Sequence, residues 1–173
     1  EAFWGPVTST IDWCEPNYRW SRFIAEPLNT VSNLSFVIFG IIGASHEYRQ
    51  KSKTSYVLMH LCISLIGLGS MAFHGTLSLL GQQLDELPMV YYLLFCLWVI
   101  NHENFAAPQR RSIVVGGLFA YAALFSVIHL TLKTTTAFQV HFVALIIVCV
   151  SQTHSRFRTI HLEEDAYKIV RGF

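Results

Sequence analysis

Five stretches of mostly apolar residues follow a polar beginning of the chain, and they set its expected architecture. We place these stretches near residues 31–46, 55–74, 87–102, 112–132 and 137–152. Each is about as long as a helix must be to cross the roughly 30 Å hydrocarbon core of a bilayer. The pattern predicts an all-α protein, a polytopic transmembrane helical bundle. A soluble bundle of buried helices fits less well, because near-continuous apolar runs with short connectors are hard to bury in so small a domain.

Composition also indicates that lipid is the solvent of this chain. Hydrophobic residues make up 53% of the 173 residues and charged residues 13%, whereas a soluble domain carries about 25% charge. The formal net charge is only +1, and no basic patch stands out in the sequence. We therefore expect a membrane protein surrounded by membrane lipid, with no nucleic-acid partner.

The first thirty residues differ from the rest, being polar, aromatic and acidic. Pro6, Pro16 and Pro27 prevent them from forming one long helix. We therefore divide the chain into an N-terminal segment, residues 1–30, and a transmembrane domain, residues 31–173. The first residue is Glu and no signal-peptide pattern follows it, so we expect an excerpt of a longer protein.

Basic residues are concentrated in alternate connectors. The connectors after spans one, three and five contain "EYRQKSK", "NFAAPQRRS" and "HSRFR", whereas residues 75–86 have no Lys or Arg and the fourth connector has only Lys133. By the positive-inside rule, the odd-numbered spans end in the cytosol. The N-terminal segment and residues 75–86 then share the lumenal or external side, although Arg19 and Arg22 count against this orientation.

The four cysteines give little evidence of a metal site. Cys62, Cys96 and Cys149 lie in apolar stretches and are expected to be buried as small hydrophobic residues. The sequence has no CxxC pair, which disfavours a thiolate zinc site. Cys14 lies in the polar segment and is either a free thiol or half of a disulfide to a segment outside this chain.

Three reactive side chains lie close together where the second span ends and the third begins. Ser70 and His74 are four residues apart, on one face of a helix, and His74 could bind a metal ion. Asp85 precedes Pro88 in "LDELP", where a helix N-cap is expected. Each residue also has a structural interpretation: an interfacial His, a helix cap, and a Ser bonded to the carbonyl four residues earlier.

The cost of ionisable groups in a membrane favours the functional interpretation of this cluster. However, catalytic zinc usually takes three protein ligands and a water. A single His at the end of the second span therefore supports a metal site only weakly.

Oxygen-bearing side chains are frequent near the N-terminus. The stretch "DWCEPNY" contains Asp12, Glu15 and Asn17, and Glu26 follows shortly after. Calcium binds six to eight such oxygens, but the EF-hand pattern is absent. The segment is either a calcium loop or a solvated acidic loop, and its carboxylates repel one another unless a cation lies between them.

Four segments of the sequence, in this order, resemble signature segments of the alkaline ceramidase family. They are "STIDWCEPNY", "FIAEPLNTVSNL", "GLGSMAFHGTL" and "QQLDELPMVY". The family comprises seven-span membrane amidases and shares a superfamily with the adiponectin-type receptors. The resemblance runs from Trp4 to Tyr92, whereas residues 93–173 match in hydropathy only. It implies that about five of the seven spans are present.

The resemblance implies a zinc ion held by three His, beside a Ser and an Asp. The matching positions are Ser70, His74 as the zinc ligand, and Asp85. The family's other two zinc ligands form an HxxxH pair on its last span, and no such pair occurs here. The resemblance thus implies that two spans and two ligands are missing, so we expect this chain to bind zinc poorly.

The resemblance also implies a calcium site beside the zinc pocket. The matching residues are Asp12, Trp13 (through its backbone carbonyl), Glu15, Asn17 and Glu26. Cys14 matches a cysteine that the family pairs with one in its later spans. Calcium is expected to raise activity by ordering the site.

The activity implied is calcium-stimulated, zinc-dependent hydrolysis of the ceramide amide bond in sphingolipid metabolism. Asp85 would take a proton from water, and Ser70 would donate a hydrogen bond to the developing oxyanion. The family implies a membrane of the endoplasmic reticulum or Golgi, with a lumenal N-terminus. Alternatives are a receptor or signalling protein of the same superfamily, and a transporter or channel, for which polar residues should line several spans.

Overall fold

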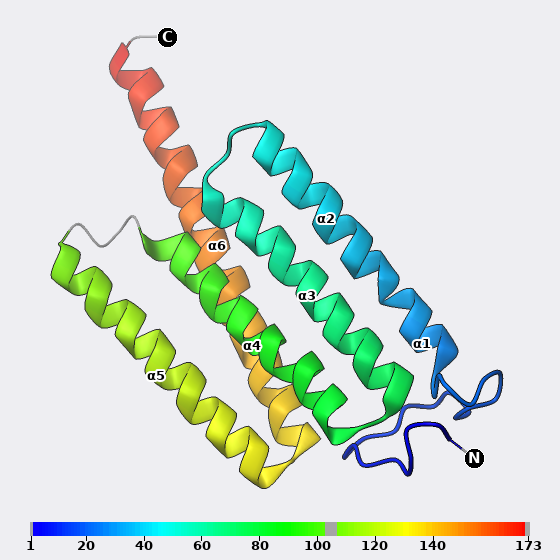
Figure 1. The fold of residues 1–173 in the computed structure, drawn as a ribbon. Coiled ribbons are helices and arrows are strands. Elements are labelled where there is room, and N and C mark those ends of the chain that lie inside the picture. The colour runs from blue at the N-terminus through cyan, green and yellow to red at the C-terminus, as the bar shows by residue number, and fades with distance from the viewer. Residues whose placement is uncertain (1, 103–106, 172–173) are drawn as a thin grey trace.

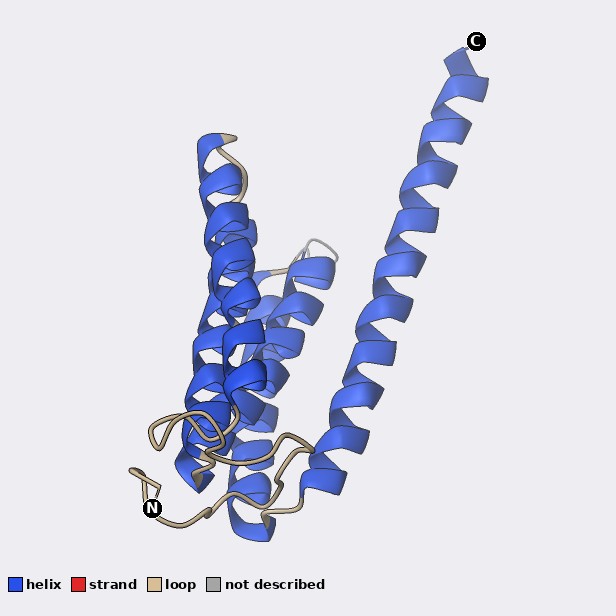
Figure 2. Cartoon of the chain, turned by 90° about the vertical axis from the view of Figure 1, so that its right-hand side faces the viewer, coloured by secondary structure: helices blue, strands red, loops and turns tan. Residues whose placement is uncertain are grey.

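The computed structural model describes residues 2–102 and 107–171, and these residues are helical apart from the N-terminal segment and the turns. Figure 1 shows the helices in chain order, and Figure 2 shows them from the side. The elements are α1 (Pro27–Ser32), α2 (Leu34–Arg49), α3 (Thr54–Thr76), α4 (Leu79–Asn101), α5 (Pro108–Leu132) and α6 (Thr135–Arg171).

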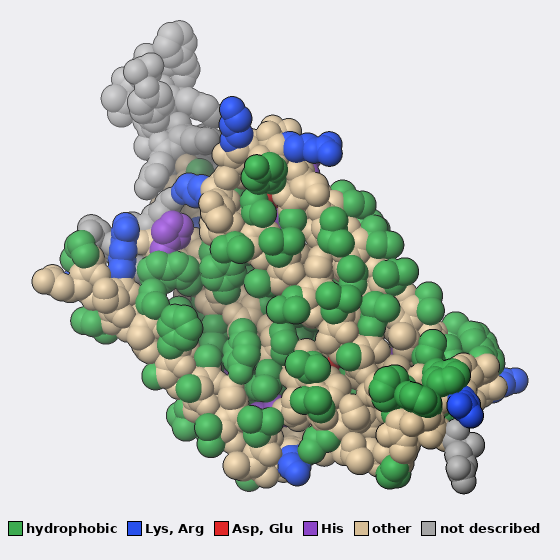
Figure 3. Space-filling model, viewed as in Figure 1, with side chains coloured by type: hydrophobic (Ala, Val, Ile, Leu, Met, Phe, Trp, Pro, Cys, Tyr) green, Lys and Arg blue, Asp and Glu red, His purple; other side chains and the backbone are tan. Residues whose placement is uncertain are grey.

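Five helices in the described part of the chain are long and apolar enough to cross a membrane. The first combines α1 and α2 as Pro27–Arg49, and the last is the Thr135–Ile160 part of α6. Apolar side chains cover the flank of the molecule, while Lys and Arg gather near its two ends (Figure 3). The prediction of an all-α transmembrane bundle is therefore confirmed.

The helices run alternately up and down, and most neighbours in sequence are neighbours in space. α2 packs on α3, α3 on α4, and both α5 and α6 contact α4. The N-terminal segment lies beneath the end of α3 and the start of α4, at the end of the bundle opposite the C-terminus (Figure 1). This arrangement puts the acidic loop and residues 75–86 at the same end. Which side of the membrane that end faces stays a prediction.

The third span begins earlier than its hydropathy indicates. α4 starts at Leu79 rather than near residue 87, because the side chain of Ser78 caps it by accepting a hydrogen bond from the N–H of Gly81. The prediction that Asp85 is the N-cap is wrong, and Pro88 lies inside the helix. The first span also begins early, at Pro27. In the third connector, residues 103–106 lie outside the described residues.

The buried apolar side chains form small clusters between helices. Cys96 and Cys149 are buried together with Leu93 between α4 and α6, as predicted for these two thiols. Cys62 is only partly buried, and Cys14 is an exposed free thiol. Since many large apolar side chains point outward, the fold matches a protein that presents its outer faces to lipid.

Candidate active site where α3 meets α4

The backbones of α3 and α4 come very close at Gly69 and Leu84, and the candidate site lies there. A Cβ atom on Gly69 would fall 2.1 Å from the carbonyl oxygen of Leu84, so only glycine fits. In a regular helix that carbonyl would accept the N–H of residue 88, but Pro88 has no N–H to donate. The next residues along the two helices are Ser70 and Asp85. The contact therefore brings a hydroxyl and a carboxyl group together from separate helices.

The three residues predicted from the sequence do meet at this junction. The Ser70 hydroxyl and the His74 imidazole both lie close enough to the Asp85 carboxyl group to interact with it electrostatically. Ser70 is buried, and His74 lies one turn further along α3. A hydroxyl, a carboxyl and an imidazole in one place can bind a carbonyl group and move a proton.

His74 is fixed by the N-terminal segment. Its Nδ1 lies 2.5 Å from Oε2 of Glu26, a residue with no exposed surface. The backbone N–H of Glu26 also donates to the His74 carbonyl at 2.9 Å. A carboxylate on one ring nitrogen leaves the other nitrogen for a metal, and metal-binding histidines commonly have such a partner. His74 with Glu26 therefore suits a zinc ligand with an orienting carboxylate.

The five residues predicted to bind calcium share one loop. The Asn17 Nδ2 group donates to Asp12 Oδ2 at 2.7 Å, and the Trp13 N–H donates to Glu26 Oε1 at 3.1 Å. The two carboxylate oxygens of Glu15 accept the first free N–H groups of α1, from Leu28 and Asn29. Glu15 thus caps α1, a role that no local sequence pattern predicted.

One buried atom in this loop has no partner. Asn17 Oδ1 is buried and accepts no hydrogen bond, which is costly unless a cation or water satisfies it. The loop offers carboxylate, amide and carbonyl oxygens, the donors that calcium prefers. The donor set therefore fits calcium.

The described side chains do not form a preorganised metal site. Among the described side chains, those of residues 2–102 and 107–160, no three His, Cys, Asp or Glu lie close enough together to hold a metal ion. For zinc, the described residues offer His74 as a single ligand, with the Glu26 carboxylate holding its other ring nitrogen. For calcium, the oxygen ligands predicted from the sequence share one loop, but they would have to move closer together to coordinate the same ion.

A small apolar core holds the N-terminal segment against the end of α3. It contains Ala25, Phe73 and Leu77, with Ile11 and Tyr18 packed on it. Leu77 is fully buried in a left-handed conformation (φ 49°), which ends α3. Its carbonyl accepts N–H groups from Thr8 and Ser9.

The hydroxyl of Tyr18 donates to the Thr76 carbonyl at 3.3 Å. Burial raises the pKa of this phenol, so it stays a donor at neutral pH. The acidic loop and His74 are consequently parts of one packed unit.

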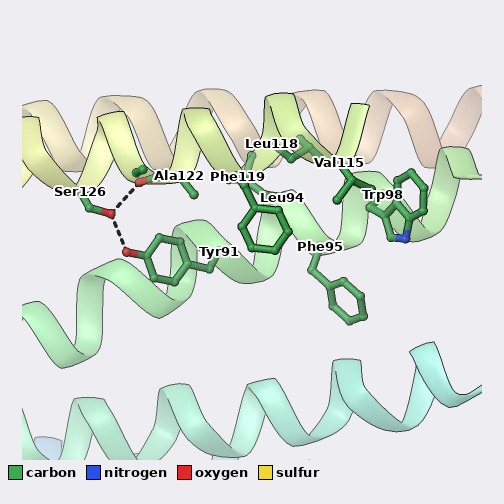
Figure 4. Close-up of a pocket in the computed structure, with 10 residues that line it drawn as sticks. Tyr91, Leu94, Phe95, Trp98, Val115, Leu118, Phe119, Ala122 and Ser126 are labelled. Atoms are coloured by element: carbon green, nitrogen blue, oxygen red, sulfur yellow. Dashed lines mark hydrogen bonds between the residues drawn. The ribbon is translucent and has the colours of Figure 1, made fainter. Parts of the chain in front are cut away.

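An apolar groove of about 620 Å³ lies between α4 and α5 (Figure 4). Leu94, Trp98 and Phe119 are among its lining residues. At one end the hydroxyls of Tyr91 and Ser126 are 2.5 Å apart. Such a surface suits hydrocarbon, and it is separate from the polar junction of α3 and α4.

A second buried polar cluster was missed in the sequence. Glu86, beside Asp85, lies 2.7 Å from the buried His129 of α5. The sequence contains only indirect evidence for this cluster. Gln82 and Glu86 are four residues apart and therefore share a helix face, but only if α4 starts before residue 82.

Comparisons with known proteins agree with the geometry. A family model described as Ceramidase matches residues 5–171. The chain is 36% identical over 167 residues to "Alkaline ceramidase" of Arabidopsis thaliana, covering 96% of this chain and 64% of that protein. It is 35% identical over 176 residues to "Alkaline ceramidase 3" of Mus musculus, covering 99% and 62%. An alkaline ceramidase of Saccharomyces cerevisiae is 32% identical over 170 residues, covering 91% and 54%. The chain thus spans less than two thirds of the length of each.

Proposed function

This chain belongs to the ceramidase family, and from that premise we propose that the protein hydrolyses the amide bond of ceramide. Water is added across the C–N bond, giving a sphingoid base and a free fatty acid. The observation that carries the proposal is the meeting of Ser70, His74 and Asp85 where the α3 and α4 backbones touch. The same three positions match the family's site.

The roles of the residues follow from their chemistry. His74 would hold zinc through the ring nitrogen that faces away from Glu26, and zinc would supply the Lewis acidity that activates water. Asp85 takes a proton as water attacks and passes one to the departing amine. Ser70 donates a hydrogen bond to the carbonyl oxygen as negative charge develops on it. Ser70 is buried and His74 and Asp85 are partly buried, which strengthens each of these interactions relative to water.

Calcium would act on the same site from the N-terminal loop. It would bind the oxygens of Asp12, Trp13, Glu15, Asn17 and Glu26. Glu26 also holds His74, so a cation that orders the loop would order the imidazole. On this proposal calcium raises turnover and takes no part in bond cleavage.

We also propose that the N-terminal end of the bundle is lumenal, in the endoplasmic reticulum or Golgi. The support is that Arg49, Lys51 and Lys53 lie at the end of α2 and in the α2–α3 turn, and Arg110 and Arg111 at the start of α5, at the end of the bundle opposite the N-terminal segment (Figure 1). An engineered glycosylation acceptor in the N-terminal segment should therefore be glycosylated in cells. Lack of modification there, with modification of an acceptor in the α2–α3 turn, would reverse the orientation.

The decisive experiment is a lipid product assay on the complete protein in detergent micelles, with ceramide as substrate. It is run with zinc or a strong zinc chelator, and with calcium present or absent. Fatty acid and sphingoid base that disappear with the chelator and increase with calcium would support the proposal. No hydrolysis by folded, zinc-loaded protein would favour the receptor alternative.

A further inference from the structure

Glu86 and His129 form a buried pair outside the proposed catalytic cluster. Oε2 of Glu86 lies 2.7 Å from Nε2 of His129, and their side chains are only 7% and 3% exposed. Both lie in helices that can span a membrane, where ionisable groups are costly and tend to mark function. A pair of this kind contributes little to stability, because desolvation offsets the attraction. Its presence in a membrane bundle therefore calls for another role.

Hydrogen bonds extend the pair into the N-terminal segment. The Gln82 amide nitrogen donates to Glu86 Oε1 at 3.0 Å. The Gln82 amide oxygen accepts the backbone N–H of Thr10 at 2.8 Å. The hydroxyl of Thr10 is hydrogen-bonded to that of Thr135, at the start of α6, with the oxygens 2.8 Å apart. One network therefore ties Glu86 to the N-terminal segment, α5 and α6.

Aromatic packing fixes the imidazole. The Phe125 ring lies parallel to that of His129, with centroids 5.6 Å apart, and Phe138 contacts it at 5.5 Å. Because His129 can turn little between these rings, Glu86 has a fixed partner.

Consecutive residues of a helix point about 100° apart. Asp85 interacts with Ser70 and His74 of α3, while Glu86 is held by His129 of α5. Any rotation of α4 about its axis would move both side chains together. We propose that Glu86, held by His129 and Gln82, is a positioning residue that sets the rotation of α4 and so directs Asp85 at Ser70. The inference rests on the proposed function in the kinetic test, which measures ceramide turnover, and does not depend on it in the disulfide test.

The kinetic test compares a conservative variant with an apolar one in the complete protein. Glu86→Gln can still accept the hydrogen bond from Gln82 and keeps a polar group against His129. Glu86→Met with His129→Leu fills the same space without polar groups, a change that buried ion pairs often tolerate in stability. We expect Glu86→Gln to keep at least half of kcat. The double variant should lose about 10- to 100-fold in kcat, the scale of an ångström-sized misplacement, with KM within twofold and an unchanged melting temperature. Glu47→Gln in α2 is the matched carboxylate control.

Two kinetic results would overturn the proposal. A folded double variant with normal kcat would mean that the polar pair positions nothing. An equal loss in folded Glu86→Gln would mean that the charge itself acts on the reaction.

A second readout does not depend on turnover. In a background without native cysteines, Ser70→Cys and Asp85→Cys should form a disulfide under mild oxidation, followed by thiol labelling. Adding Glu86→Met and His129→Leu should slow this reaction at least fivefold. An unchanged rate refutes positioning whatever the ceramide assay shows. A slowed rate with no ceramide hydrolysis by the parent protein supports positioning and refutes the proposed function instead.

Discussion

Replacing Gly69 by Ala tests whether the close approach of α3 and α4 makes the site. The new Cβ would lie 2.1 Å from the Leu84 carbonyl oxygen and 2.8 Å from its carbon. Carbon and oxygen normally stay about 3.3 Å apart or more, so the helices must separate by on the order of 1 Å. Both opposing atoms are backbone, so no side-chain rotation can relieve the clash. Asp85, the next residue after Leu84, moves with it.

An ångström-sized misplacement of a reacting group can cost about 100-fold in rate, which is about 2.7 kcal/mol in activation free energy. We expect Gly69→Ala to lower kcat for ceramide by about that factor. KM should change less, because the apolar groove between α4 and α5, which suits hydrocarbon chains, lies away from this contact.

The assay is fatty-acid release by purified complete protein in micelles, with melting temperature measured in parallel. Gly116→Ala in α5 is the matched control, since nothing lies within 4 Å of its Cβ position, and it should keep normal turnover. A folded Gly69→Ala protein with kcat within twofold of the parent would refute the reasoning that this contact aims Asp85.

Three further variants test the other parts of the site. Asp85→Asn should abolish ceramide turnover while circular dichroism and melting stay normal; near-normal activity would remove the proton-transfer role. Glu15→Ala should weaken calcium stimulation in the product assay and, by uncapping α1, cost about 1 kcal/mol of stability; an unchanged calcium dependence would take Glu15 out of the calcium site. Leu77→Ala, at a fully buried position, should cost about 2 to 4 kcal/mol in thermal unfolding and expose residues 1–26 to protease, whereas a protease pattern like that of the parent would contradict its anchoring role.

The spans could be predicted from the sequence because burial in lipid requires long apolar helices, and composition reports that directly. Their ends could not. α4 begins within a polar stretch, where Gln82 is buried by hydrogen bonds to Thr10 and Glu86. A hydropathy profile assigns such a residue to a connector, because the profile depends only on local sequence. It contains no information on a hydrogen-bond partner seventy residues away.

The candidate site was partly predictable for the same reason. Ser70 and His74 lie on one helix, so their spacing places them together. Asp85 joins them only through the contact at Gly69, and His129 reaches Glu86 from another helix. Those meetings depend on how helices pack, which local periodicity does not encode.

The bonds between the N-terminal segment and the end of α3 determine the order in which the protein can assemble. The N–H groups of Ala25 and Glu26 bond the carbonyls of Gly75 and His74, and those of Thr8 and Ser9 bond the carbonyl of Leu77. During synthesis the segment is made before these partners, which follow some fifty to seventy residues later at the end of the second span. These bonds can therefore form only once α3 is complete. The proposed catalytic centre thus matures after the first two spans have been made, although part of it precedes them in the chain.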